Sequence, residues 1–264
     1  MPDSRLDAAL GERGLARSRT HAARLIADGL VTVDGASQVK PSYRVRDEQR
    51  IEVAGSDHYV SRAAHKLIAA LDAFGVDPRG LVALDAGAST GGFTQVLLER
   101  GAKHVLAIDV GHGQLATEIQ ENGSLTSVEG FNIRDITREW VGSQLRSPEF
   151  PKVVVADLSF ISLTLVLAAL RDAVDPAADF VLLVKPQFEV GRGGIREGIV
   201  RDAGARQDAV STILWSAWDL GLGTAGVISS PIAGNAGNRE YLIWLSAAKG
   251  SNPGDWNQVV RDLV

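Results

Sequence analysis

Short apolar runs alternate with helix-like segments along the chain from about residue 80 onward. The runs have the length and composition of buried strands, and apolar residues recur every three or four positions in the segments that follow them. This alternation predicts an α/β domain with a doubly wound, mostly parallel sheet. A helix is expected near residues 202–220. The predicted strands are residues 81–84, 105–108, 125–128, 151–156, 179–184, 224–228 and 240–245.

The N-terminal residues, up to about residue 55, show a different pattern of short helices and short strands. Apolar positions predict a short helix capped by Ser4 and a second helix over residues 19–27 capped by Ser18. Residues 31–35 are typical of a strand that enters a tight turn, and residues 50–53 of a later strand. We therefore expect a small α+β domain here.

Length and composition agree with a small module joined to one larger domain. The chain has 264 residues, of which 45% are hydrophobic and 22% charged, and this is ordinary for a soluble protein with a full core. The short polar stretch 55–59 is the expected hinge. The predicted domains are therefore residues 1–59 and 60–264.

Several classes of protein and site are disfavoured by what the sequence lacks. The chain has no cysteine, which excludes disulfides, and its five histidines show no metal-ligand spacing, so we expect no metal. No apolar signal region opens the chain, and the longest uncharged apolar run, residues 158–170, is too short to span a bilayer. We therefore expect a cytoplasmic protein without a membrane partner.

The first predicted strand of the larger domain leads into an acidic residue and a glycine-rich turn. Glycines there would let a ligand lie against the backbone. The turn departs from the G-x-G-x-x-G dinucleotide fingerprint, and Asp85 stands where a pyrophosphate would meet a carboxylate. S-adenosylmethionine fits better, because it has no phosphate and carries an ammonium and a sulfonium group. Another nucleotide, or a turn without a ligand, stays open at this point.

Further cofactor contacts are expected after the second and third strands. Asp109 ends the second strand and is placed to accept hydrogen bonds from ribose hydroxyls. Asn132 follows the third strand and can reach an adenine edge. The candidate cofactor-binding residues are Asp85, Gly87, Ser89, Thr90, Gly91, Gly92, Phe93, Asp109, Val110, Asn132 and Asp157.

Charged residues stand at the ends of several predicted elements. Asp157 and Lys185 end consecutive strands. Glu240 heads the last strand, and Lys66 lies in the helix before the first strand. Because ligands bind outside the carboxyl ends of parallel strands, we expect these candidate catalytic residues to converge on the cofactor site. A structural role is the alternative for each of them alone, and a lysine such as Lys66 ordinarily extends its charge to solvent.

Two lysines and two acids at a cofactor pocket suit methyl transfer to a poor nucleophile such as a ribose hydroxyl. The hydroxyl must lose its proton as it attacks, and a lysine made neutral by burial or by a cationic neighbour can take that proton. The carboxylates can orient the lysine and hold the hydroxyl in line with the methyl group.

A basic segment near the N-terminus changes the meaning of the net charge of −5, which by itself argues weakly against nucleic-acid binding. Residues 13–24 contain four arginines and no acid. Local clusters decide phosphate contacts, so this segment outweighs the overall charge, and a solvated helix face is the alternative. The candidate RNA-binding residues are Arg5, Arg17, Ser18, Arg19 and Arg24.

Both parts of the chain resemble known families. The N-terminal part resembles an S4-type RNA-binding domain, in which a basic second helix lies on structured RNA. The four charged residues of the larger domain resemble the Lys-Asp-Lys-Glu tetrad of the FtsJ-like ribose 2′-O-methyltransferases. That resemblance implies a Rossmann-like class I methyltransferase fold, with a seven-stranded sheet whose last strand is antiparallel. The N-terminal stretches that carry the first resemblance are Arg5-Leu6-Asp7, Gly14-Leu15-Ala16-Arg17-Ser18-Arg19 and Gly29-x-Val31-x-Val33-Asp34-Gly35.

The whole chain is similar to the TlyA family, whose members are named as haemolysins but act as 2′-O-methyltransferases on ribosomal RNA. This resemblance implies that Lys185 is the general base and that Asp157, Lys66 and Glu240 position the substrate and the base. It also implies cytidine 2′-hydroxyls in 16S and 23S ribosomal RNA as targets and ribosomal subunits as partners. The matched stretches include Val60-Ser61-Arg62-x-x-His65-Lys66-Leu67, Asp109-Val110-Gly111-x-Gly113-Gln114-Leu115, Ala156-Asp157-Leu158-Ser159-Phe160, Val184-Lys185-Pro186-Gln187-Phe188-Glu189 and Gly237-Asn238-x-Glu240-Tyr241.

Three alternative functions stay beside this hypothesis. An RNA base N-methyltransferase would carry an Asn/Asp-Pro-Pro-aromatic motif where this chain has Asp157-Leu158-Ser159-Phe160, without the prolines. A pore-forming haemolysin matches the family's name but needs a membrane-length segment. A non-catalytic RNA-binding factor would not need the tetrad. The glycine-rich loop 191–198 and a possible extra helix over residues 255–264 have no assigned role, and the oligomeric state stays open.

Overall fold

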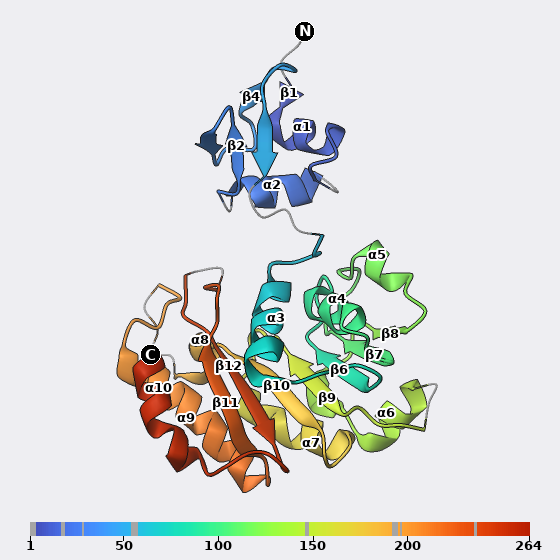
Figure 1. Ribbon diagram of the computed structural model, residues 1–264, viewed down its shortest axis with the longest axis vertical. Helices are drawn as coiled ribbons and strands as arrows, with labels where there is room; N and C mark the ends of the chain where they lie inside the picture. Colours follow the sequence, from blue (N-terminus) through green and yellow to red (C-terminus); the bar gives the residue numbers. More distant parts are fainter. Residues whose placement is uncertain are drawn as a thin grey trace. The chain divides into compact units, whose positions relative to one another are not determined.

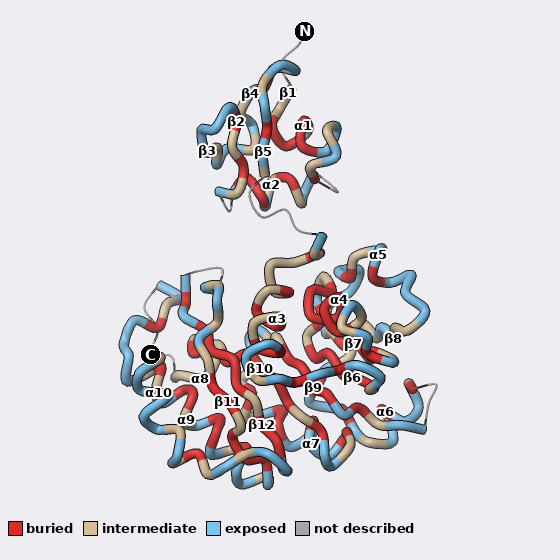
Figure 2. The backbone as a smooth tube through the Cα atoms, viewed as in Figure 1, coloured by how far each residue is buried: buried red, intermediate tan, exposed pale blue. Residues whose placement is uncertain are grey.

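The computed structural model contains two compact units, Met1–Tyr59 and Val60–Val264, each with its own hydrophobic core (Figures 1 and 2). The structure describes residues 4–16, 19–27, 29–53, 58–145, 148–191, 195, 197–234 and 237–264. Two of the candidate RNA-binding residues, Arg17 and Ser18, lie outside the described residues. Most of the predicted hinge and part of the glycine-rich loop lie outside them as well.

The N-terminal unit joins two short helices to two small antiparallel sheets. One sheet has the order β3-β2-β5, and in the other β1 pairs with β4. Leucines, valines, alanines and two isoleucines, mainly from both helices and from β2, β4 and β5, form one buried cluster. The elements are Ser4–Arg5 (β1), Leu6–Glu12 (α1), Arg19–Ala27 (α2), Val31–Val33 (β2), Ala36–Gln38 (β3), Arg44–Val45 (β4) and Ile51–Val53 (β5).

Most of the local predictions for this unit are confirmed. The second helix has the predicted bounds, and the tight turn after β2 places Asp34 and Gly35 at φ 51° and 80°. The predicted helix cap at Ser4 is wrong. Ser4 pairs with Val45 in β1, and Arg5 occupies the N-cap of α1 without a side-chain cap bond. Strand pairing runs up to the first helical residue, so the backbone of Ser4 serves the sheet.

The larger unit is built on a seven-stranded sheet with the order β11-β12-β10-β9-β6-β7-β8. β12 is antiparallel to both of its neighbours, and the other strand pairs are parallel. This order confirms the predicted Rossmann-like fold with an antiparallel last strand. The strands are Val82–Ala86 (β6), His104–Ile108 (β7), Leu125–Val128 (β8), Val153–Ala156 (β9), Asp179–Val184 (β10), Gly223–Ser229 (β11) and Tyr241–Ser246 (β12).

Helices pack on the sheet in two groups (Figure 1). α3 and α4 contact each other; α3 also contacts β10, β11 and β12, and α4 contacts β6 and β7. α6, α7, α9 and α10 share one large apolar cluster with alternate residues of the strands. The helices are Ala63–Phe74 (α3), Gly92–Glu99 (α4), Thr117–Gln120 (α5), Arg138–Gln144 (α6), Leu167–Ala173 (α7), Pro186–Glu189 (α8), Ala203–Asp219 (α9) and Asn257–Leu263 (α10), with 3-10 turns at Ile133–Asp135 (η1), Leu163–Leu165 (η2) and Pro253–Trp256 (η4).

The uncharged run at residues 158–170 is part of this buried cluster. It contains η2 and most of α7, and its Leu163, Leu167 and Leu170 are almost fully buried. Within the described residues, none of the helices combines the length and the apolar character that crossing a membrane requires. The predicted helix near the C-terminus is present as α10, whose Val260 joins the core.

Candidate active site

One lysine–carboxylate pair forms where two parallel strands end side by side. β9 and β10 pair in register from Val153 and Asp179 onward, so the residues that follow these strands emerge at the same edge of the sheet. Lys185 Nζ lies 2.6 Å from Asp157 Oδ1 in an ion pair, and the two side chains are only 11% and 16% exposed. Lys185 Nζ also donates a hydrogen bond to Ser159 Oγ at 2.9 Å.

A second pair joins the helix before the sheet to the start of the last strand. Lys66 in α3 donates from Nζ to Glu240 Oε2 at 2.6 Å, and the side chains are 10% and 2% exposed. The default expectation that Lys66 extends its charge to solvent is therefore wrong, because α3 packs on β12 and faces the carboxylate. A Cβ at Gly234 would collide with the Glu240 carboxylate, so a glycine is needed beside this pair.

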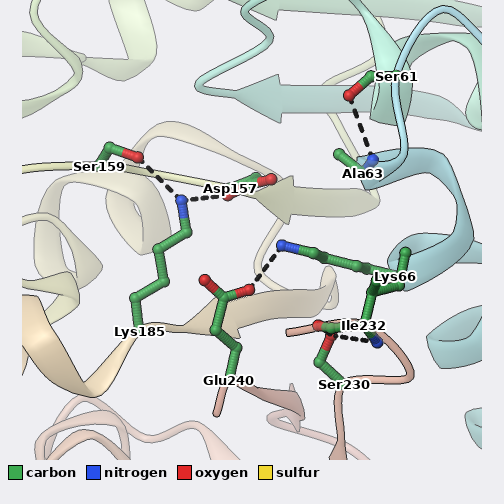
Figure 3. Close-up of polar contacts among 9 residues, drawn as sticks. All are labelled: Ser61, Ala63, Lys66, Asp157, Ser159, Lys185, Ser230, Ile232 and Glu240. Atoms are coloured by element: carbon green, nitrogen blue, oxygen red, sulfur yellow. Dashed lines mark hydrogen bonds and ion pairs between the residues drawn. The ribbon is translucent and has the colours of Figure 1, made fainter. Parts of the chain in front are cut away.

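All four charged groups point into one space between the strand ends and α3 (Figure 3). The sequence-based prediction that Lys66, Asp157, Lys185 and Glu240 converge agrees with this arrangement. Two lysines face two carboxylates there, and such pairing offsets part of the cost of burying charged side chains. The arrangement can hold a polar substrate group and exchange a proton with it.

The glycine-rich turn lies beside this cluster, between β6 and α4. Gly87 and Gly91 have φ values of 85° and 95°, which favour glycine. A Cβ at Gly87 would lie 2.8 Å from the carbonyl oxygen of Asp157, and one at Gly91 would lie 2.7 Å from the side chain of Leu115. The expectation that glycines leave room for a ligand needs a correction here. At these two positions the protein's own atoms occupy the space.

Asp85 ends β6 as a fully buried carboxylate. Thr94 Oγ1 donates to Asp85 Oδ2 at 2.6 Å, while Oδ1 has no hydrogen-bond partner within the part of the chain that the structure describes. Burial raises the pKa of Asp85 to about 7, against the opposing hydrogen bonds from Thr94. The carboxylates of Asp157 and Asp109 raise that pKa further. Three acids around one turn favour a cationic ligand over a pyrophosphate.

The other candidate cofactor residues have mixed positions. Asp109 accepts backbone hydrogen bonds from Ser89 at 2.8 Å and from Gly111 at 2.7 Å. An ionised carboxylate has about four acceptor sites, so Asp109 keeps capacity for ribose hydroxyls. Asn132 Oδ1 caps η1 by accepting from the backbone N–H of Arg134, which uses one of its two lone pairs. The other lone pair and the amide N–H groups remain for an adenine.

The apolar candidates of the turn divide in the same way. Val110 is 69% exposed, whereas Phe93, in the first turn of α4, is 2% exposed. Phe93 is therefore a core residue beside the glycine-rich turn, and it is too buried to contact a bound cofactor directly. Gly92 is close-packed as well, because a Cβ there would lie 2.8 Å from Ser61 Cβ.

Candidate RNA-binding arginines of the N-terminal unit meet at a buried acid that the sequence analysis did not single out. Arg5 makes two hydrogen bonds to Asp7, at 3.0 and 2.9 Å, and Arg19 makes one at 3.4 Å. The Arg5 hydrogen bond lowers the pKa of Asp7. The Arg19 side chain keeps 66% of its surface exposed. Arg13, also in the basic segment, donates to backbone carbonyl groups of residues 46–49 and is structural. Arg24 lies in the last turn of α2.

Two polar side chains beside Lys185 had no predicted role. One is Ser159, and the other is Glu189 at the end of α8. Glu189 accepts hydrogen bonds from Ser162 Oγ at 2.5 Å and from the backbone N–H of Leu163 at 3.0 Å. Burial raises the pKa of Glu189, and these two hydrogen bonds oppose the shift. Ser159 could have been found from the sequence, because it stands two residues after Asp157. No local sequence feature distinguishes Glu189.

Comparison with known protein families gives a match to each unit. Residues 59–247 match the FtsJ-like methyltransferase family, and residues 4–51 match the S4 domain. The 16S/23S rRNA (cytidine-2′-O)-methyltransferase TlyA of Mycobacterium tuberculosis is 47% identical over 92% of this chain and 89% of its own length. Hemolysin A of Brachyspira hyodysenteriae is 38% identical over 90% of this chain and 98% of its own length.

Solved structures agree with these matches. A hemolysin-named protein from Streptococcus thermophilus has a TM-score of 0.76 and 35% identity, and the similarity covers 99% of this chain and 96% of that one. A second hemolysin-named protein, from Lactococcus lactis, has a TM-score of 0.70 and 38% identity over 76% of this chain and 97% of that one.

Proposed function

The chain belongs to the TlyA family of FtsJ-like methyltransferases, and from this premise we propose that it methylates the ribose 2′-hydroxyl of cytidine in 16S or 23S ribosomal RNA. The observation that carries the proposal is the pair of lysine–carboxylate contacts, each of 2.6 Å, at the strand ends beside the glycine-rich turn. The M. tuberculosis relative is named for cytidine 2′-O-methylation of 16S and 23S rRNA.

The residues of the turn fit S-adenosylmethionine as cofactor. When bound, S-adenosylmethionine supplies a methyl group on a positively charged sulfur. Asp85, with its buried and unpartnered Oδ1, is placed to balance a cationic group, and Asp109 is placed to accept from ribose hydroxyls. The neighbouring carboxylate of Asp157 adds to the negative potential there. This charge pattern supports S-adenosylmethionine over a dinucleotide.

Lys185 is the proposed general base. In its neutral form it accepts the proton of the 2′-hydroxyl, and Asp157 holds the resulting ammonium in the ion pair. Lys66 and Glu240 bind and orient the hydroxyl from the opposite side. Because only the neutral lysine can accept a proton, the rate of transfer is expected to rise with pH.

The S4 domain is the proposed contact with ribosomal RNA. Arg19, Arg5 and Arg24 lie on or beside α1 and α2, and Arg19 exposes most of its side chain. Arginines at such positions grip phosphates and suit RNA that is recognised by shape. Asp7 lies between Arg5 and Arg19 and orders both guanidinium groups before RNA arrives.

A transfer assay with labelled methyl S-adenosylmethionine tests this function. Isolated 30S and 50S subunits and free rRNA serve as substrates, and the labelled positions are then mapped. We expect label on a cytidine ribose oxygen. Label on a base would replace the proposal by the base N-methyltransferase alternative, and cofactor binding without label on any RNA would remove the catalytic role.

A further inference from the structure

The nitrogen of Lys185 has oxygen atoms on two sides. Asp157 Oδ1 lies 2.6 Å away in an ion pair, whereas the contact with Ser159 Oγ at 2.9 Å has hydrogen-bond geometry (Figure 3). Ser159 is exposed, while the side chains of Lys185 and Asp157 are 11% and 16% exposed. The hydroxyl of Ser159 therefore lies at the open side of the pair, where a substrate would arrive.

The stereochemistry of a neutral amine gives this arrangement a consequence. The nitrogen carries one bond to carbon, two N–H bonds and one lone pair, in a tetrahedral arrangement. An oxygen atom within 3 Å repels a lone pair, so the lone pair turns away from Asp157 Oδ1, which makes an ion pair, and from Ser159 Oγ, which accepts one N–H. The lone pair is then left with the remaining corner.

We propose that Ser159 is a positioning residue that fixes the rotation of the neutral Lys185 amine and so aims its lone pair at the ribose hydroxyl. This inference rests on the proposed function, in which Lys185 accepts the proton. The proton passes from the 2′-oxygen to Nζ while the oxygen–methyl bond forms and the sulfur–methyl bond breaks. The products are the 2′-O-methyl ribose, S-adenosylhomocysteine and the Lys185 ammonium.

The loop that carries Ser159 is tied to the helix that follows Lys185. Glu189, at the end of that helix, accepts hydrogen bonds from Ser162 Oγ and from the backbone N–H of Leu163. The ring of Phe188 packs at 5.2 Å from the ring of Phe160. The two hydrogen bonds of Glu189 and the ring contact between Phe188 and Phe160 thus hold the loop of Ser159 and the helix after Lys185 together.

The backbone next to Ser159 adds to this constraint. Phe160 has a φ of 65°, a conformation that is strained for a residue with a Cβ and persists only where its surroundings impose it. The chain turns sharply at this point, so the serine hydroxyl faces back toward Lys185. A catalytic lysine with four rotatable side-chain bonds needs such a fixed partner to keep one orientation.

Ser159→Ala tests the inference in the full-length protein. Single-turnover methyl transfer to the rRNA substrate is expected to fall about tenfold, because one orienting hydrogen bond is lost. The affinity for S-adenosylmethionine, measured by calorimetry, should stay at the wild-type value. Ser159→Thr keeps the hydroxyl and should recover most of the rate. Ser216→Ala, which removes a hydroxyl bound to a helix carbonyl on α9, is the matched control.

The pH–rate profile separates positioning from a merely structural role. Because Ser159 accepts from the Lys185 nitrogen, its removal should move the midpoint of the profile, whereas loss of a purely structural contact should leave the midpoint in place. A wild-type rate and midpoint for Ser159→Ala, together with an inactive Lys185→Ala, would overturn this inference and keep the proposed function. An equal loss at every pH with weaker RNA binding would overturn it too, because Ser159 would then be a substrate contact. An active Lys185→Ala would instead remove the proposed function itself.

Discussion

The two lysine–carboxylate pairs of the site have the same contact distance and different surroundings. Lys66–Glu240 joins residues 174 positions apart, and its carboxylate is 2% exposed. Lys185–Asp157 joins neighbouring strand ends, and its carboxylate is 16% exposed and next to the exposed Ser159. The first pair, here called the closed pair, buries its carboxylate more deeply and ties α3 to the last strand, while the second, the open pair, has the more exposed carboxylate. Both pairs face the space between the strand ends and α3 (Figure 3). Equal distances therefore do not imply equal roles.

The largest expected effect is on the open pair. Lys185→Ala removes the proposed proton acceptor, so the single-turnover rate should fall about 10²–10⁴-fold with nearly unchanged cofactor affinity. The free energy of unfolding should fall less than on loss of Lys66, because the Asp157 side chain is 16% exposed and that of Glu240 only 2%. Lys152→Ala, an exposed lysine just before β9, is the control. A wild-type rate in Lys185→Ala would end the distinction between the two pairs.

The closed pair should show its effect in stability. Lys66→Met leaves Glu240 buried without a counter-charge, and the free energy of unfolding should drop by about 3–5 kcal/mol in urea titration. Adding Glu240→Gln should recover most of that loss but no activity. Lys249→Met breaks an ion pair whose lysine is 56% exposed and should cost at most about 1 kcal/mol. Equal losses for Lys66→Met and Lys249→Met would contradict the assignment.

Asp85 is a third carboxyl group of the site. It is fully buried, and unlike Asp157 and Glu240 it makes no ion pair with a lysine within the described residues. Its pKa of about 7 lies above the ordinary value of 3.8, so between these values the folded protein holds a proton that the unfolded chain has released. Stability should therefore fall as pH rises from about 4 to 7. Asp85→Asn should remove this fall and stabilise the cofactor-free protein at pH 8 by on the order of 4 kcal/mol, with little change at pH 4.

Urea midpoints at the two pH values measure this effect. Asp72→Asn, at an exposed carboxylate on α3, is the control. The same pH slope in Asp85→Asn and wild type would show that Asp85 is ionised throughout. Calorimetry should also find weaker S-adenosylmethionine binding in Asp85→Asn, because the proposed counter-charge is gone.

The smallest expected effect concerns an exposed arginine. Arg19→Ala should weaken rRNA binding modestly and lower the slope of log affinity against log salt by about one, as for the loss of one phosphate contact. Arg261→Ala, on α10 of the other unit, should leave the slope unchanged. A wild-type slope for Arg19→Ala would place the RNA contact elsewhere.

Local sequence patterns predicted many of the helices and strands. The bounds of β8, β10 and α2 agree with residues 125–128, 179–184 and 19–27, because apolar run length and helical spacing are properties of contiguous residues. The two-residue strands β1 and β4 escaped prediction. They form only through pairing with each other across the N-terminal unit.

The sequence by itself determined that Asp157 and Lys185 would meet, since both directly follow strands and parallel strands end at one edge of a sheet. Only the tertiary structure decided the partners that lie far apart in the chain. Helix packing seals Lys66 against Glu240, and the folded loop after β9 brings Ser159 to Lys185. Asp7 likewise brings together Arg5 and Arg19, of which only Arg19 belongs to the basic segment 13–24. Strand ends are set by local chemistry, whereas side-chain partners depend on the distances that packing creates.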